Sequence, residues 1–590
     1  MADSSHEQRT HSMRRWLGYI VAFIILPAVL MLAAEWGLRA GGYGRSTRPF
    51  IEHNLGDKTL HVLNSHYFDQ FFFTPIHNTY LWNAGSWVEI VTPKPKQTCR
   101  VIVFGGSASQ GFPYQKYCFR RMLEVMLEAQ YPAIDFEVCC AAFFAVNSHA
   151  MRPMAEACAQ LEPDLYLIYM GNNEANGPFA LWHVENRGTT VPSLAYIRAC
   201  LWARNVRLIQ LAGEVGSYLH VVRSTADDAA AEERDLEHEA QLLERVYHHY
   251  EANIEAVCDA GLGAGAGVVL CSLGVNVRDW QPSGAVHLTK LEPTALDAWN
   301  THWADGVAQE EAGAYRDAIG SYEKAEAIDD TFSRLQFRMG CCYWDLGEYE
   351  AAREHFMRAW ELDLFMWLRA SPRSNQIVAE VARRRSSEGV LLADCQGAFE
   401  KASPHGVPGH EFFSDTCHLT FEGNYLATCT MLEQVVQALP EWVRARGPAE
   451  AEPLSREECM ERLGVTPSEL AEHARQELES YQLTRIRHLE DLEARIEEME
   501  QRSTGDPVAE RFAACRRALE VGRPSHELLF MFVHELLGHV RPDEALEKAR
   551  LLEEYFPGRG YAHLVLARAL ANKGKADEAV PEYEAALALH

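Results

Sequence analysis

Residues that could carry out nucleophilic chemistry occur at three places in the 590-residue sequence, each shortly after an apolar run. Ser107 follows a pair of glycines, Asn173 lies in a Gly-Asn-Asn-Glu run, and Asp415 precedes His418 by three residues. Serine, histidine and aspartate are the residue types with which proteins activate a hydroxyl group as a nucleophile. Because Asp415 and His418 are so close in sequence, their side chains can meet on one short loop. The three segments therefore predict a Ser–Asp–His site.

The elements that must position these residues alternate between apolar runs and helical segments. Ser107 lies in a tight turn between a buried run and a helix through 119–123, so its hydroxyl is expected at the carboxyl end of a strand, where open α/β sheets bind ligands. Amide groups at the start of that helix could stabilise an anion. A turn that only caps the helix explains this segment equally well when it is taken alone. Five runs predict the strands of one parallel sheet: 101–104, 136–138, 165–170, 268–271 and 390–393.

Three sequence blocks resemble those of the SGNH (GDSL-type) serine hydrolases. Phe104-Gly105-Gly106-Ser107 resembles their first block, Gly171-Asn172-Asn173-Glu174 their Gly-x-Asn-Asp block, and Asp415-x-x-His418 their Asp-x-x-His block. The order and spacing of the blocks fit, and the resemblance covers about 96–437 apart from an insertion.

Two longer phrases, 169–174 and 418–425, resemble a bacterial subgroup of membrane-anchored SGNH proteins with attached tetratricopeptide repeats. The resemblance implies the α/β class, with a flavodoxin-like three-layer SGNH hydrolase domain around a parallel five-stranded sheet. This domain would be divided into residues 96–290 and 369–444. The implied reaction is hydrolysis of an acyl ester without a cofactor.

The resemblance also implies a role for each site residue. Ser107 would be the nucleophile, His418 its general base, and Asp415 the residue that fixes the imidazole tautomer. The oxyanion would be bound by the backbone N–H of Ser107, a backbone N–H near Ala142 and the side-chain amide of Asn173. Loss of one such donor costs about 3–4 kcal/mol of transition-state stabilisation.

The sequence departs from the family pattern at three positions. Gly106 stands where the family has aspartate, Ala142 best matches a family glycine, and Glu174 replaces an aspartate. None of these changes removes the triad, but together they leave a catalytically silent hydrolase fold as an alternative. Asn173 could also serve only to cap a turn.

A metal site is the rival interpretation of the loop that contains Asp415 and His418. Potential ligands are dense there, but their spacing fits no regular helical or knuckle site. We therefore expect no metal ion. The candidate ligands are His405, His410, Asp415, Cys417 and His418.

Repeats with a period of 34 residues, the length of a tetratricopeptide repeat, occur in two places. Small residues recur where helices would cross closely, and aromatic residues recur where they would fill the gaps. The pattern predicts inserted repeats over 291–368 and appended repeats over 503–590, which would bind a protein partner. Seven residues recur 34 positions later in the first stretch: Gly306, Tyr315, Ala318, Tyr322, Ala325, Ile328 and Asp329.

Two further segments lie between the hydrolase domain and the appended repeats. Residues 445–466 begin with a stretch rich in Gly, Pro and Glu and are predicted to form a linker. Residues 467–502 are predicted to form one long coiled-coil-like helix. Its apolar seam consists of Leu489, Leu492, Ile496 and Met499.

The N-terminal part predicts a membrane anchor. Residues 16–34 contain no charged side chain, and a stretch of this length is long enough for a helix that crosses a bilayer. We expect a tail over 1–15, a single transmembrane helix over 16–36, and a membrane-proximal segment over 37–95 that packs on the hydrolase. Basic residues flank the helix on both sides, so the positive-inside rule decides the orientation weakly, in favour of an exported catalytic part on the periplasmic side.

Composition narrows the function classes. Asp and Glu number 83 against 55 Lys and Arg, a net charge of −28, which argues against a nucleic-acid partner. The 15 cysteines show neither zinc-type pairs nor a disulfide framework, so we expect buried free thiols. No phosphate loop or dinucleotide fingerprint occurs.

Three functions fit these observations. The leading hypothesis is a membrane-anchored serine hydrolase that cleaves an acyl ester of a saccharide or a lipid through a Ser107 acyl-enzyme. The second is a carbohydrate O-acetyltransferase that uses the same triad. The third is a tetratricopeptide interaction scaffold whose hydrolase fold is silent.

Overall fold

The computed structural model describes residues 16, 19, 21–72, 88–181, 190–218, 236–363, 369–448, 450, 452–483, 489–503 and 505–589. The chain divides into two units. The first spans 1–48, 64–77 and 192–234, and the second spans 49–63, 78–191 and 235–590.

The second unit contains a five-stranded parallel sheet, as the sequence predicts. The strand order is β5-β4-β6-β7-β8, and every neighbouring pair is parallel. In such a doubly wound order, ligands bind where the direction of winding reverses, which is here between β4 and β6. The strands are β4 (Thr98–Gly105), β5 (Asp135–Cys140), β6 (Leu165–Tyr169), β7 (Gly267–Cys271) and β8 (Val390–Ala393).

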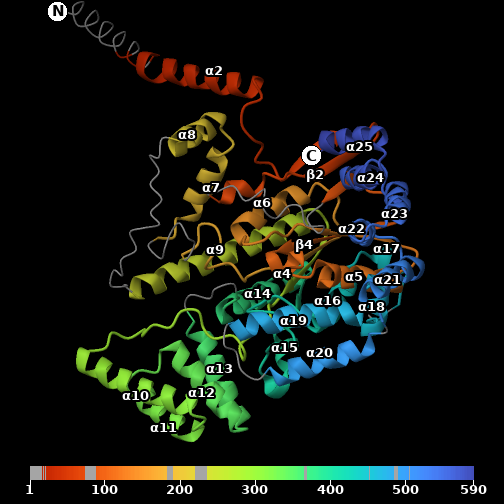
Figure 1. The fold of residues 1–590 in the computed structure, drawn as a ribbon. Helices are drawn as coiled ribbons and strands as arrows, with labels where there is room; N and C mark the ends of the chain where they lie inside the picture. The colour runs from red at the N-terminus through yellow and green to blue at the C-terminus, as the bar shows by residue number, and fades with distance from the viewer. Residues whose placement is uncertain are drawn as a thin grey trace, which may run out of the picture. The chain divides into compact units, whose positions relative to one another are not determined.

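Helices cover both faces of this sheet (Figure 1). On one face, Val101 and Val103 of β4 share a core with Leu123 and Met431 of two covering helices. On the other face, the Tyr166 hydroxyl donates a hydrogen bond to a helical carbonyl, that of Ala155. The first face is covered by α5 (Phe119–Gln130) and α16 (Phe421–Ala438), and the second by α6 (Ser148–Cys158), α9 (Leu236–Gly263) and α14 (Pro372–Arg384).

The insertion between β7 and β8 consists of two helical hairpins, as the repeat pattern predicts. The glycines of the pattern lie where the helices cross closely. A Cβ atom at Gly306 would lie 2.4 Å from the Tyr322 ring, and one at Gly340 would lie 2.9 Å from the Phe356 ring. The four helices are α10 (Pro293–Glu311), α11 (Tyr315–Glu326), α12 (Ser333–Asp345) and α13 (Tyr349–Glu361).

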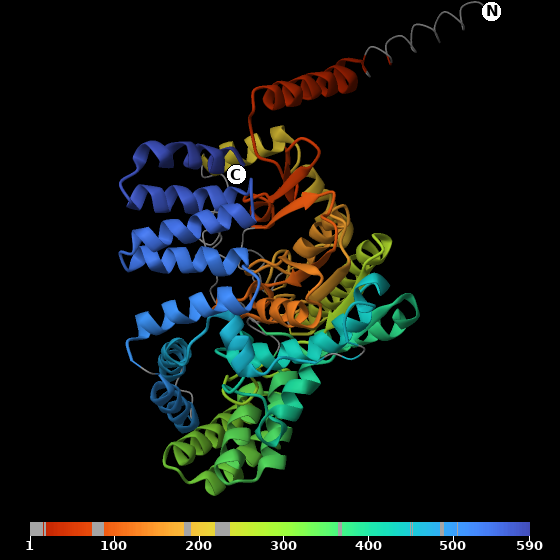
Figure 2. The same cartoon turned by 90° about the vertical axis from the view of Figure 1, so that its right-hand side faces the viewer.

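Successive antiparallel helices form the C-terminal part, which Figure 2 shows in blue. They share one core, to which Phe532, Leu552 and Val565 contribute. The helices are α21 (Pro507–Val521), α22 (His526–Gly538), α23 (Pro542–Tyr555), α24 (Gly560–Asn572) and α25 (Ala576–Leu589).

Two predictions for the region between the α/β domain and these helices are wrong. The predicted linker 445–466 contains a packed helix, α18 (Arg456–Leu463), whose Cys459 is fully buried. The predicted single helix 467–502 is two helices, α19 (Pro467–Leu483) and α20 (Glu490–Arg502). Arg475 and Glu500 form an ion pair between them, although a continuous helix would separate them by about 37 Å. The apolar seam of α20 therefore packs on α19, in the same chain.

A small antiparallel sheet precedes the α/β domain. It consists of β1 (Phe50–Asn54), β2 (Thr59–Leu63) and β3 (Glu89–Thr92). Leu589 of α25 packs against its apolar face, and the Glu89 carboxylate accepts hydrogen bonds from the N–H groups of Gly560 and Tyr561 at the start of α24. This part of the predicted segment 37–95 therefore packs on the appended helices.

The first unit contains α2 (Leu26–Ala40), α7 (Leu194–Ala203) and α8 (Arg207–Tyr218). The Glu35 carboxylate accepts hydrogen bonds from the N–H groups of Arg207 and Leu208, which fixes α2 to the start of α8. No described helix is long and apolar enough to cross a membrane. The tail 1–15 and part of the predicted span 16–36 lie outside the described residues, so the anchor stays a prediction.

All 15 cysteines lie in the described part of the chain and are free thiols. Most are buried in the cores, as expected from their spacing. Burial raises the pKa of several of these thiols, for example that of Cys459 to about 12, so they are uncharged near neutral pH.

Candidate active site

Ser107, His418 and Asp415 meet at the carboxyl end of β4. The Ser107 hydroxyl lies 2.7 Å from His418 Nε2, and His418 Nδ1 lies 2.5 Å from Asp415 Oδ2. With the imidazole proton on Nδ1, the hydroxyl donates to Nε2 and Nδ1–H donates to the carboxylate. Ser107 and His418 are both buried. This arrangement can transfer the hydroxyl proton to the imidazole as the oxygen attacks a carbonyl carbon.

Asp415 is held in the ionised form that this arrangement requires. Burial alone would raise its pKa, but the interaction with His418 and hydrogen bonds from the backbone N–H groups of Cys417 and His418 hold the pKa below its ordinary value. The carboxylate therefore keeps its charge near neutral pH and stabilises an imidazolium on His418.

The loop that contains Asp415 and His418 is a tight turn closed by its own backbone. Phe413 and Leu419 form an antiparallel bridge, and the Ser414 N–H donates to the His418 carbonyl. The Thr416 carbonyl at the tip accepts a hydrogen bond from the N–H of Asn276, at the start of the insertion. These contacts close the short loop on which Asp415 and His418 lie three positions apart.

Asn173 lies beside the turn that contains Ser107. Its side-chain Nδ2 donates a hydrogen bond to the Val146 carbonyl at 3.0 Å, and the side chain is buried. A Cβ atom at Gly106 would lie 2.8 Å from this Nδ2, so the absence of a side chain at 106 gives the amide its place next to Ser107. The amide therefore lies beside the Gly106–Ser107 turn, and its role as an oxyanion donor stays a prediction.

Ala142 does not join this group of donors. The N–H groups of its neighbours Ala141 and Phe143 donate to β4 carbonyls, those of Val103 and Gly105. Because N–H groups alternate in direction along an extended chain, the Ala142 N–H is directed away from β4 and the serine turn. The chain comes close to Gly106 only further on, at Val146. The residue before it, Ala145, has a left-handed backbone with φ 56°. The extended geometry therefore breaks at Ala145, where the chain turns towards Gly106.

Glu174 has a structural partner. Its carboxylate accepts hydrogen bonds from the Ser148 N–H at 3.0 Å and the Ser148 hydroxyl at 2.7 Å, at the first residue of α6. Burial raises the pKa of Glu174 to about 7, against the lowering effect of these bonds. The longer side chain at this position therefore connects the end of β6 to α6, next to Asn173.

The five candidate metal ligands do not converge. The His405 ring stacks on Tyr349 of α13 with a centroid distance of 3.5 Å. His410 lies between two carboxylates, with Nδ1 2.8 Å from Asp279 and Nε2 2.8 Å from Asp491 of α20. Although burial opposes it, these bonds raise the pKa of His410 to about 9. Ligand atoms of Asp415, Cys417 and His418 do lie within 4.8 Å of one another, but His418 uses both nitrogens in the triad.

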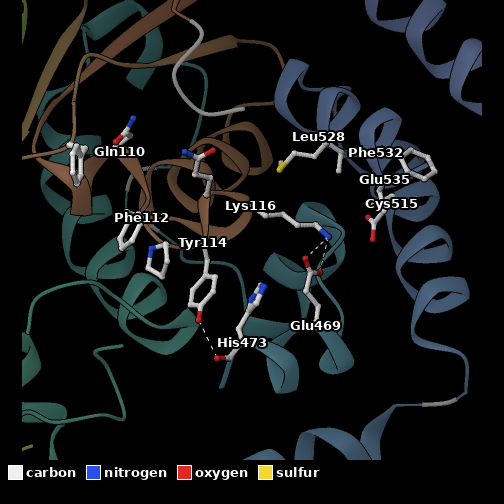
Figure 3. A pocket seen from close by; sticks show the side chains of 14 residues that line it. Gln110, Phe112, Tyr114, Lys116, Glu469, His473, Cys515, Leu528, Phe532 and Glu535 are labelled. Carbon is white, nitrogen blue, oxygen red and sulfur yellow. Dashed lines mark hydrogen bonds and ion pairs between the residues drawn. The ribbon is translucent and has the colours of Figure 1, made fainter. Parts of the chain in front are cut away.

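A cavity of about 410 Å³ adjoins the triad. Its lining includes Phe112, whose ring centroid lies 4.8 Å from that of His418. The lining continues onto α19, α21 and α22. Figure 3 shows Lys116 directed at Glu469, and Tyr114 beside His473, with which it stacks at a centroid distance of 4.0 Å.

The comparisons with known proteins bear on the repeats. Residues 333–364 match the tetratricopeptide repeat family, so the inserted repeat is confirmed there. Among solved structures, the chain is similar to one described as the crystal structure of MamA protein, with 13% identity over 50% of this chain and 92% of that chain, at a TM-score of 0.14. No curated protein matches the sequence.

Sequence reasoning did not find the residues of α19 that lie behind the triad loop. The buried Tyr481 hydroxyl donates to the Phe413 carbonyl at 2.5 Å and accepts from the Asn276 side-chain amide at 3.2 Å. Burial raises the pKa of Glu477 to about 8, and the nearby charge of Asp415 adds to this effect. Only the fold brings α19 to this loop, so no local motif could have shown these residues.

Proposed function

We propose that the protein is a serine hydrolase of SGNH type that cleaves an acyl ester through a covalent Ser107 acyl-enzyme. One observation carries the proposal: Ser107 Oγ, His418 and Asp415 form a continuous hydrogen-bonded chain with distances of 2.7 and 2.5 Å. They come from segments more than 300 residues apart, so the arrangement is not a product of local sequence.

In this reaction His418 removes the Ser107 proton as the oxygen forms a bond to the carbonyl carbon of the ester. The negative charge that develops on the carbonyl oxygen is stabilised by the Ser107 N–H and the Asn173 amide. His418 then gives its proton to the alcohol oxygen as the bond to the acyl carbon breaks. Water attacks the acyl-enzyme with His418 again as the base, which releases the acid and restores Ser107. Transfer of the acyl group to a sugar hydroxyl would follow the same steps with that hydroxyl in place of water.

Covalent labelling tests this proposal. We expect a fluorophosphonate probe to add one adduct per chain, located at Ser107 by peptide mass mapping. Ser107→Ala should abolish the adduct, and Asp415→Asn should slow labelling strongly because the histidine tautomer is no longer fixed. Ser386→Ala, at an exposed serine outside the site, is the matched control and should label like the wild type. Folded wild-type protein that takes up no probe would contradict the proposal.

A second function is favoured by the tetratricopeptide match at 333–364, because such repeats bind protein segments. If the hydrolase fold were silent, this binding would be the whole function. Affinity purification from membranes with the full chain should then recover a stoichiometric partner that a chain with charge reversals on α12 and α13, the helices of the matched repeat, does not recover. Recovery of none would weigh against it.

A further inference from the structure

The cavity beside the triad has walls from two parts of the chain. Gln110, Phe112 and Lys116 come from the segment that follows Ser107, whereas Glu469, His473 and Met531 come from the appended helices α19 and α22. These helices are firmly attached to the α/β domain. Glu527 of α22 is buried and forms ion pairs with Arg120 at 2.5 Å and Arg121 at 2.9 Å, both buried on α5.

The position of the cavity indicates which part of an ester it would hold. In acyl transfer the histidine protonates the leaving alcohol, so the alcohol lies on the histidine side of the acyl carbon and the oxyanion lies on the side of its N–H donors. Phe112 packs on the His418 ring and lines the cavity, so the cavity reaches the histidine side of the site.

The charges on the cavity wall cancel in pairs. Lys116 Nζ lies 2.8 and 3.1 Å from the two carboxylate oxygens of Glu469, and Arg511 Nε lies 2.7 Å from Glu535. Burial lowers the pKa of His473, so its imidazole is uncharged near neutral pH. The wall therefore offers hydrogen-bonding groups without a net charge.

Aromatic and aliphatic side chains complete the lining. Phe112 is 47% exposed, and Phe144, Met531 and Phe532 also face the cavity. A purely hydrocarbon ligand would cover the Lys116–Glu469 pair without offering it a hydrogen bond, which is costly. A ligand with hydroxyl groups on one side and C–H groups on the other satisfies both kinds of surface.

We propose that this cavity binds the alcohol portion of the ester and that this portion is an uncharged saccharide, selected in part by the appended helices α19 and α22. This inference rests on the proposed function for its place in the reaction, and it names the substrate class and a second wall of the site. Met531 and the Lys116–Glu469 pair are binding residues in it, not catalytic ones.

Binding can be measured without turnover. Saturation-transfer NMR on full-length Ser107→Ala protein would use neutral methyl glycosides of glucose, mannose, xylose and N-acetylglucosamine, with 1-octanol as the lipid-like alcohol. We expect at least one glycoside to bind and Met531→Trp, which fills the cavity from α22, to weaken that binding by about 10-fold or more. Val521→Trp, an exposed position on α21 outside the lining, is the matched control and should bind like the parent.

Each outcome decides the inference. Glycoside binding that Met531→Trp removes and Val521→Trp keeps supports it. Met531-dependent binding of 1-octanol, without binding of any glycoside, would assign the cavity to a lipid and overturn the inference. The absence of any binding, or glycoside binding that Met531→Trp leaves unchanged, would also overturn it. Because fluorophosphonate labelling of Ser107 is measured separately, failure of the hydrolase proposal is distinguishable from failure of this one.

Discussion

Gly106→Ala tests whether the lack of a side chain before Ser107 sets the position of the Asn173 amide. The Gly106 backbone is extended, with φ −93° and ψ −152°, so alanine introduces no left-handed strain there. Its Cβ would lie 2.8 Å from Asn173 Nδ2, whereas ordinary contact begins at 3.4 Å. The amide must therefore move by about 0.6 Å, away from the turn that contains the nucleophile.

This displacement predicts a definite loss of activity. Complete loss of an oxyanion donor costs about 10²–10³ in kcat, and a misplacement of about 1 Å can cost about 10²-fold. A shift of 0.6 Å should therefore lower kcat/KM by about 10- to 20-fold, or about 1.4–1.8 kcal/mol of transition-state stabilisation. A thermal melt of the variant would separate this effect from destabilisation by crowding.

A double-mutant cycle with Asn173→Ala shows where the loss arises. We would measure kcat/KM with 4-nitrophenyl acetate for the wild type, both single variants and the double variant. If Gly106→Ala acts by displacing the amide, it should have almost no effect once Asn173 is alanine. An equal loss in both backgrounds, or no loss in the wild type, would refute the reasoning.

Three further predictions concern stability. Burial raises the pKa of Glu477 to about 8 in the folded protein, against about 4.5 in the unfolded chain. Between these pH values the folded protein keeps a proton that the unfolded chain has released, so the free energy of unfolding falls as pH rises. Glu477→Gln should remove this loss of stability, which amounts to a few kcal/mol at pH 9 and can be measured by urea unfolding. Glu479→Gln, at an exposed position, should leave the loss unchanged. Tyr481→Phe leaves the Phe413 carbonyl without its donor and should lower the free energy of unfolding by about 1–3 kcal/mol, with a fall in kcat larger than any rise in KM. Glu527→Ala leaves the buried Arg120 guanidinium without its carboxylate partner and leaves Arg121 with Glu124 alone, so it should cost about 3–5 kcal/mol in the same measurement.

The strands and the triad could be predicted because their signals are local. The strands β4 and β6 are short apolar runs buried along their whole length, and Ser107 and Asn173 follow them closely. The 34-residue period was equally readable, since it reflects close crossings such as that of Gly306 over Tyr322. In these cases the residues that determine the structure are neighbours in sequence.

The errors lie where distant contacts decide. The apolar seam of residues 489–499 was recognised, but its partner is α19 of the same chain, which a helical period cannot reveal. The match of Ala142 to a family glycine could not show where its N–H points, because the direction of an N–H depends on which strand its neighbours pair with. The contacts of Tyr481 and Glu477 with the triad loop likewise depend on how the appended helices fold back.

The insertion is connected to the site at both of its ends, which relates the repeats to the chemistry. On leaving β7, the Asn276 N–H donates to the Thr416 carbonyl, between Asp415 and His418. On returning, the Ala370 N–H donates to the side chain of Asn172, the neighbour of Asn173. A partner that shifted the inserted helices would therefore pull on the triad loop and on the oxyanion side together. The proposed protein binding by the repeats and the proposed ester cleavage at Ser107 are thus compatible in one unit, and hydrolysis rates measured with a bound partner would report their coupling.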